Sequence, residues 1–253
     1  DPAVLEKIWG DWEKFASYAF NKSHATCYSW VAYQTAYMKA HYPAEYMAAL
    51  MTRRFSQITE ITKLMEECQS MNIKTLGPDI NESYRAFGVN EHGEIRFGLS
   101  AIKGMGAPAA DAIVAEREKN GAYKDIFDFA QRVDFSNVNR KAFESLALSG
   151  GFDSFGIPRE DFFAKDSKGN VFLDTLVKYG QLYQREQQEA VTSLFGGVEA
   201  VEIATPPIPK GEPWSTIEKL NKERELVGIY LSAHPLDDYS IVLHSMCNTH
   251  CTE

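Results

Sequence analysis

The sequence contains no hydrophobic run long enough to cross a bilayer, so we expect no membrane-spanning segment. Its first residues show no basic region followed by an apolar stretch, and we therefore expect no secretory signal and a cytoplasmic location. Four cysteines are too few for a disulfide framework in a chain of 253 residues. What remains is an ordinary globular composition, 44% hydrophobic and 24% charged, that can build a sizeable core and two or more units.

Basic residues are not in surplus either. The chain has 26 lysines and arginines against 35 acids, which gives a formal net charge of −9. Nonspecific DNA affinity comes largely from cations that contact phosphates. If a chain with a negative net charge binds DNA, the source of its affinity for phosphates has to be explained. Either basic residues are locally concentrated, or the contact is small and uses backbone amides, or other parts of a longer chain supply the charge. The composition leaves all three open.

Patterns typical of metal sites are also scarce. The adjacent acids Asp237-Asp238 and Glu66-Glu67 would point in different directions on regular structure, so no two-metal catalytic site is predicted. Four soft ligands that could hold zinc lie near the end of the sequence: His244, Cys247, His250 and Cys251. Their spacing matches no common zinc module, and we favour an incidental cluster. Cys27 and Cys68 lie in apolar helical patterns and are expected to be buried thiols.

Hydrophobic periodicity predicts a mainly α-helical fold with one small β-hairpin. Apolar residues recur at helical spacing over residues 4–19, 25–41, 43–54 and 58–68. A short hairpin is expected within residues 87–97, where two apolar runs flank a polar turn, and helices resume near Ser100. Residues 181–191 resemble a polar helix end or a linker. The proline-rich residues 204–213 predict an extended connector, and a last helix is expected over 216–226.

One helix-entry turn combines a cation, a hydroxyl, an imidazole and an amide, on Asn21, Lys22, Ser23 and His24. Free amides and the positive end of a helix dipole suit a polyanion such as a triphosphate. The alternative is that Asn21 or Ser23 is an ordinary N-cap and His24 a surface residue, and the residues alone favour it. Tyr28 and Tyr33 on the following helix could stack on a base, but periodicity favours core packing for both.

A sharper signal is the glycine hairpin formed by Lys103, Gly104, Met105 and Gly106. Glycines in a helix-hairpin-helix turn let backbone amides approach a DNA phosphate with no Cβ in the way. Pro108 sits early in the next helix, and the alanines that follow allow close helix packing. Lys103 could add an ionic contact. The alternative is a helix corner with a glycine C-cap, but hairpin, proline and alanines together favour DNA binding.

A second, looser hairpin leads from Arg140 and Lys141 through an apolar helix to Gly150 and Gly151. Tandem hairpins can hold two phosphates without reading the base sequence. We expect these four residues to contribute to DNA binding, although a solvated helix end explains the two cations equally well.

Leu194 and Phe195 form an apolar pair within a polar stretch. Such a pair can anchor a peptide in a partner's pocket. The alternative is a short tether that folds back on its own domain.

Several of these motifs, in this order, closely resemble the α subunits of bacterial DNA polymerase III, the C-family replicative polymerases. They are Phe20-Asn21-Lys22-Ser23-His24, Tyr33-Gln34, the run from Lys39 to Tyr46, Gly77-Pro78-Asp79-Ile80-Asn81, Ala101 to Gly106, Ser149 to Asp153, and Gly228 to Pro235. The resemblance covers nearly the whole chain, and its last dozen residues are the least recognisable.

The resemblance implies an internal fragment with four parts. These are the C-terminal part of the fingers domain (1–82), a tandem helix-hairpin-helix DNA-binding domain (83–160), a clamp-binding segment (161–200), and a linker and helix leading to a missing OB-fold (201–253). Residues 21–24 match the family's motif beside the incoming nucleotide, and Gly104 and Gly106 match its hairpin that holds duplex DNA. Leu194 and Phe195 match the family's sliding-clamp motif, but Val191 stands where that motif has glutamine.

The function implied is DNA-templated DNA synthesis by the parent protein, a DNA-directed DNA polymerase. Its catalytic aspartates and Mg²⁺ belong to a palm that is absent here, so this fragment alone is predicted to be inactive and to bind no cofactor. The implied partners are primer-template DNA, dNTP, the sliding clamp (β subunit) and other polymerase III holoenzyme subunits, with no membrane, in a bacterial, nucleoid-associated setting. The alternative is a stand-alone helix-hairpin-helix or clamp-docking module without catalysis.

Overall fold

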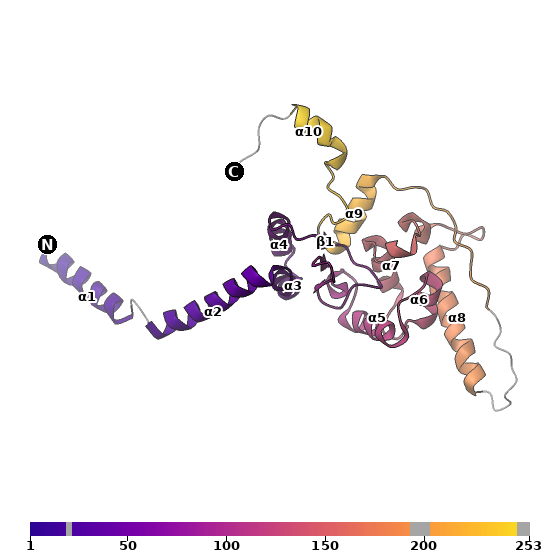
Figure 1. Cartoon of the computed structure of the whole chain (residues 1–253), viewed down its shortest axis with the longest axis horizontal. Coiled ribbons are helices and arrows are strands. Elements are labelled where there is room, and N and C mark those ends of the chain that lie inside the picture. The colour runs from indigo at the N-terminus through magenta and orange to yellow at the C-terminus, as the bar shows by residue number, and fades with distance from the viewer. Residues whose placement is uncertain (19–21, 193–202, 247–253) are drawn as a thin grey trace. The chain divides into compact units, whose positions relative to one another are not determined.

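The computed structural model describes residues 1–18, 22–192 and 203–246. The fold is mainly helical with one small sheet, as the sequence predicts (Figure 1). The chain divides into two compact units, residues 1–46 and 47–253, and each is described by itself. The four domain boundaries expected from the sequence stay predictions. No helix within the described ranges is long and apolar enough to cross a membrane.

The first unit consists of α1 (Pro2–Tyr18), α2 (Lys22–His41) and the start of α3 (Pro43–Arg54). The helices lie where periodicity predicts them, but the burial expected for α2 is wrong. Tyr28 and Tyr33 are 67% and 63% exposed, and Cys27 is exposed as well. Apolar and aromatic residues lie on every side of α2, so packing of one face could not bury them all.

The second unit begins with the rest of α3 and with α4 (Ile58–Ser70), which precede a three-stranded sheet. The predicted hairpin is confirmed: β2 (Gly88–Val89) pairs antiparallel with β3 (Ile95–Arg96). β1 (Thr75–Leu76) adds a parallel strand on the other side of β3, giving the order β1-β3-β2. Periodicity does not reveal β1, because two residues are too short to show an alternation.

The core of this unit lies among four helices and the short turns between them, and Figure 1 shows them gathered into one body. The helices are α5 (Ala107–Asn120), α6 (Ile126–Arg132), α7 (Arg140–Ser149) and α8 (Phe172–Thr192). Five fully buried phenylalanines fill the space: Phe129, Phe143, Phe152, Phe162 and Phe172. The rings of Phe129 and Phe143 lie 5.1 Å apart, a normal separation for favourable aromatic pairs.

Side-chain caps fix where α6, α7 and the later helix α9 (Thr216–Val227) begin. Asp125 accepts hydrogen bonds from two amides of α6, and Asn139 accepts one from the Ala142 amide of α7. Ser215 does the same for α9, which Gly228 ends in a left-handed conformation. Each cap satisfies a backbone amide that a helix terminus leaves unpaired. Three short helices, η1 (Leu99–Ala101), η2 (Asp153–Phe155) and η3 (Arg159–Phe163), connect these elements.

The predicted connector has neither helix nor strand over residues 203–215. Its end is held against η3, because the Gly211 amide donates to Asp161 Oδ1 at 2.7 Å and Trp214 stacks on Phe163 at 5.6 Å. η4 (Asp237–Tyr239) and α10 (Ser240–Met246) complete the described chain. The connector thus places α9 against the helical core and does not lead to a separate domain.

Candidate nucleic-acid interface

The glycine hairpin is a tight turn between η1 and α5. The Met105 amide donates to the Ile102 carbonyl at 3.0 Å, which closes a four-residue turn. Gly104 occupies the third position with φ +89°, in the left-handed region that glycine adopts without steric cost. A Cβ there would lie 2.7 Å from Ser145 Oγ, so α7 approaches too closely for a side chain. Gly104 is therefore required by both conformation and space.

The peptide that joins Lys103 to Gly104 is held on one side by α7. Ser145 Oγ donates to the Lys103 carbonyl oxygen at 3.0 Å, so this carbonyl points toward the helix. In a trans peptide the C=O and the following N–H point in opposite directions. The Gly104 amide consequently points away from α7. The preceding amide, of Lys103, donates to the Leu226 carbonyl at the end of α9 at 2.9 Å.

The start of α5 adds further donors. Gly106 is its N-cap, with an extended conformation and no side-chain cap, and the first turn contains no acid. Within the described ranges, no hydrogen bond is made by the amides of Gly104, Gly106, Ala107 and Ala109. Unpaired amides at a helix N-terminus, together with the helix dipole, favour an anion.

Two lysines lie at this turn. Lys103 is exposed and makes no ion pair with any residue that the structure describes. The Lys141 side chain passes 3.5 Å from the Cβ position of Gly104, and its Nζ lies 3.4 Å from Glu144. Lys141 therefore joins the first hairpin, although the sequence places it in the second.

Arg140 is already paired with two carboxylates. Its guanidinium donates to Asp174 at 2.6 Å and to Glu144 at 2.8 Å. The hydrogen bond with Asp174 raises the pKa of Arg140 above its usual range. Since two carboxylates already neutralise this side chain, it would have to leave them to contact a phosphate.

Gly150 and Gly151 have a structural role in place of the expected amide presentation. Both amides donate to the Leu146 carbonyl and end α7, and both glycines are buried. Gly150 has φ +88°, and the Arg159 guanidinium occupies the space where its Cβ would be. Neither amide is available to a phosphate in this conformation, because the helix cap consumes both. Met105, also expected at the DNA, has a buried side chain that anchors the turn to the core.

Of the four residues expected beside a nucleotide, Asn21 lies outside the described residues. Lys22, Ser23 and His24 form the first turn of α2 and are exposed. The His24 ring contacts the Tyr28 ring, with centroids 4.4 Å apart. The arrangement places a cation and an imidazole at a helix N-terminus, as the sequence suggests.

The remaining sequence candidates are not described. Leu194 and Phe195 lie outside the described residues, as do Cys247, His250 and Cys251, and the His244 side chain is not described either. Among the residues that are described, no three His, Cys, Asp or Glu side chains group as a metal site.

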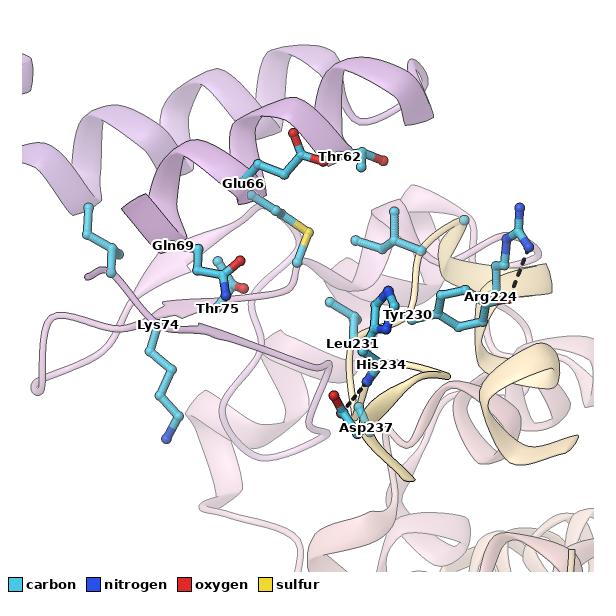
Figure 2. Close-up of a pocket in the computed structure, with 15 residues that line it drawn as sticks. Thr62, Glu66, Gln69, Lys74, Thr75, Arg224, Tyr230, Leu231, His234 and Asp237 are labelled. Atoms are coloured by element: carbon cyan, nitrogen blue, oxygen red, sulfur yellow. Dashed lines mark hydrogen bonds between the residues drawn. The ribbon is translucent and has the colours of Figure 1, made fainter. Parts of the chain in front are cut away.

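Sequence reasoning missed the partners that orient the hairpin, Ser145 and Leu226, because neither has a functional motif. It also missed a groove of about 910 Å³ between α4 and the residues that follow α9. Figure 2 shows Glu66 and Gln69 on one side and Tyr230 and His234 on the other. Its charges are mixed, and Arg224 donates to the Tyr230 hydroxyl at 3.0 Å.

Comparison with known proteins places these features in context. A family model described as a helix-hairpin-helix motif matches residues 72–162. The chain is 42% identical over 243 residues to DNA polymerase III subunit alpha of Chlamydia trachomatis, and 41% identical to that of Pasteurella multocida. It is 38% identical over 234 residues to the same subunit of Escherichia coli.

These matches cover 94%, 94% and 92% of this chain, but 19%, 20% and 20% of the relatives. The chain thus spans about one fifth of the length of the curated relatives it matches. The resemblance drawn from the sequence motifs is confirmed: this chain is homologous to part of DNA polymerase III subunit alpha, and it carries a helix-hairpin-helix motif.

Proposed function

We propose that the chain is the part of a DNA-templated DNA polymerase that grips duplex DNA, and that the Gly104 and Gly106 amides bind a backbone phosphate. The observation that carries this proposal is the pair of amides at the start of α5, beside Lys103 and Lys141, that have no hydrogen-bond partner among the described residues. Phosphate contacts fix position without reading bases, so the grip is independent of DNA sequence. This suits a polymerase, which must hold any template.

The acidic net charge is compatible with this role. A contact built from a few amides and two lysines needs no basic surface, and it neutralises few phosphates. The affinity of this chain alone should therefore be modest and should depend weakly on salt. Of the three explanations for the net charge, the local geometry supports the small amide-based contact.

The experiment is a titration of the whole chain with two duplexes of unrelated sequence. We expect equal dissociation constants for the two duplexes, and weaker binding when Gly104 and Gly106 are both changed to valine. Circular dichroism shows whether that variant remains folded. Unchanged binding by a folded double variant, or a strong preference for one duplex, refutes the proposal.

A nucleotide role for the start of α2 is a separate proposal. Lys22 and His24 would neutralise triphosphate charge, which stabilises the charge developing during phosphoryl transfer. The resemblance implies Mg²⁺ on palm carboxylates; the described residues here form no cluster of that kind, and we assign no step to a metal. In the full-length polymerase, Lys22→Ala should raise the KM for dNTP. An unaltered KM would count against the phosphate contact.

We also propose that Leu194 and Phe195 dock on a sliding clamp, on the strength of the motif alone. Both should fill an apolar pocket of the clamp, so changing both to alanine should abolish association in a pull-down of the whole chain. Restoring glutamine with Val191→Gln should strengthen association. Retained binding by the double alanine variant would place the anchor elsewhere.

A further inference from the structure

Helix α9 carries an acid at the centre of its buried stripe. Leu220, Leu226 and Val227 are apolar members of that stripe, and Glu223 among them is only 1% exposed. Burying a carboxylate is strongly unfavourable unless its charge and its lone pairs are satisfied. Glu223 must therefore have specific partners, and their positions are constrained by it.

Those partners come from two other parts of the fold. Glu223 Oε1 accepts hydrogen bonds from the Leu231 and Ser232 amides, at 2.6 and 2.8 Å. Oε2 accepts from Arg159 Nη1 at 3.0 Å and from the Ser232 hydroxyl. Arg159, itself 4% exposed, also donates to the Leu148 carbonyl near the end of α7. One carboxylate thus ties α9, the segment after it and the end of α7 together.

The same helix holds the DNA-binding turn. Leu226 lies on the stripe beside Glu223, and its carbonyl is one of the last four of α9, which lack a partner inside the helix. It accepts the Lys103 amide at 2.9 Å. Ser145 of α7 holds the carbonyl of the same residue, Lys103. The direction of the Gly104 amide therefore depends on how α7 and α9 are placed relative to each other.

We infer that Glu223 is a positioning residue for the hairpin, and that the DNA-binding unit extends through α9 to Ser232. The match to the helix-hairpin-helix model ends at residue 162, so this part lies outside it. The inference rests on the proposed function of the Gly104 and Gly106 amides. A leucine at position 223 would complete the apolar stripe without fixing any partner, whereas the carboxylate holds four donors in one arrangement.

The test uses the whole chain and two readouts. Amide hydrogen exchange, followed by NMR, compares the Lys103 amide with the Ile113 amide in the middle of α5. Duplex titration gives the dissociation constant. We expect Glu223→Gln to speed exchange at Lys103 by roughly tenfold relative to Ile113, since it frees a local unit. Duplex binding should weaken by roughly twofold to thirtyfold, the range of coupling through packed elements.

Two controls separate positioning from stability. Phe172→Leu weakens the core at the start of α8, where the Phe172 ring packs against Phe127 and Phe162, so it should not raise exchange at Lys103 relative to Ile113. Ser232→Ala removes one hydroxyl donor and should act in the same direction as Glu223→Gln with a smaller effect. If Glu223→Gln does not fold, the ratio of exchange at Lys103 to exchange at Ile113 in Ser232→Ala tests the inference in its place.

An unaltered exchange ratio in the folded variants, or wild-type duplex affinity in folded Glu223→Gln, overturns the inference. Failure of the proposed function has a different signature, which is wild-type affinity in folded Gly106→Ala. In that case the exchange ratio alone still decides whether Glu223 orients the loop.

Discussion

Replacing Gly106 by alanine should weaken DNA binding without weakening the fold. Gly106 has φ −76° and ψ 154°, which alanine adopts readily, and the added Cβ would lie 3.6 Å from Pro108 Cδ, an ordinary contact. Alanine at an N-cap costs about 0.5–1 kcal/mol relative to glycine. Loss of glycine's freedom in the unfolded chain offsets this by about 0.4–1 kcal/mol. The net change in the free energy of unfolding should stay within about 0.5 kcal/mol.

The binding change should be larger. In the proposed contact the added methyl group would obstruct the approach of a phosphate to the Gly106 amide, and a hydrogen bond to a charged group contributes about 1.5–3 kcal/mol. The dissociation constant for duplex DNA should therefore rise by roughly tenfold to a hundredfold. The assay pairs urea unfolding with fluorescence anisotropy of a labelled duplex, so that stability and affinity are measured on the same preparation.

Gly77→Ala is the matched control. A Cβ at Gly77 would meet no atom of the described residues within 4 Å, and Gly77 lies outside the hairpin, so this variant should retain both stability and affinity. Wild-type affinity in folded Gly106→Ala would refute the reasoning, because it would show that no phosphate approaches this amide. A loss of affinity in Gly77→Ala of the same size would show that the effect is not specific to the hairpin.

Three further predictions concern neighbouring features. Gly104→Ala should lower the free energy of unfolding by about 2–3 kcal/mol. A positive φ costs alanine about 1–2 kcal/mol, and the new Cβ displaces the Ser145 hydrogen bond, worth about 1 kcal/mol. Wild-type stability in urea would contradict this prediction. Lys103→Glu and Lys141→Glu should each reduce the slope of log affinity for duplex against log salt concentration by about one unit. The control Lys119→Glu, at the far end of α5, should leave this slope unchanged. Equal slopes in all three variants would contradict phosphate contacts by Lys103 and Lys141. Burial raises the pKa of the Cys68 thiol from 9.0 to about 11. The buried neutral thiol therefore makes its full contribution to the free energy of unfolding below pH 9, and this contribution is lost as the pH rises through 11. The wild-type chain should accordingly lose more stability than Cys68→Ala between pH 8 and about 10.5, and parallel losses would contradict the assignment.

The glycine hairpin could be predicted from sequence because its requirements are local. A left-handed position, an early proline and small residues at the helix contact all leave a mark within about ten residues. Gly150 and Gly151 carry a similar mark, but a glycine pair after an apolar helix is equally the pattern of a C-cap. Only the hydrogen bonds to Leu146 distinguish the two roles.

What sequence could not supply are the long-range partners. Glu223 and Arg159 are far apart along the chain, and an acid within a helical stripe predicts an exposed face rather than a buried anchor. The Ser145 and Leu226 contacts to Lys103 have the same character. The exposure of Cys27, Tyr28 and Tyr33 likewise depends on tertiary packing, which helical periodicity does not contain.

The most direct measurement is the response of backbone amides to duplex DNA, recorded by ¹⁵N NMR on the whole chain. The amide signals of Gly104 and Gly106 should shift on addition of a short duplex, while those of Gly150 and Gly151, consumed by the α7 cap, should stay in place. Stationary Gly104 and Gly106 signals under conditions where the chain binds DNA would contradict the claim that these amides hold the phosphate.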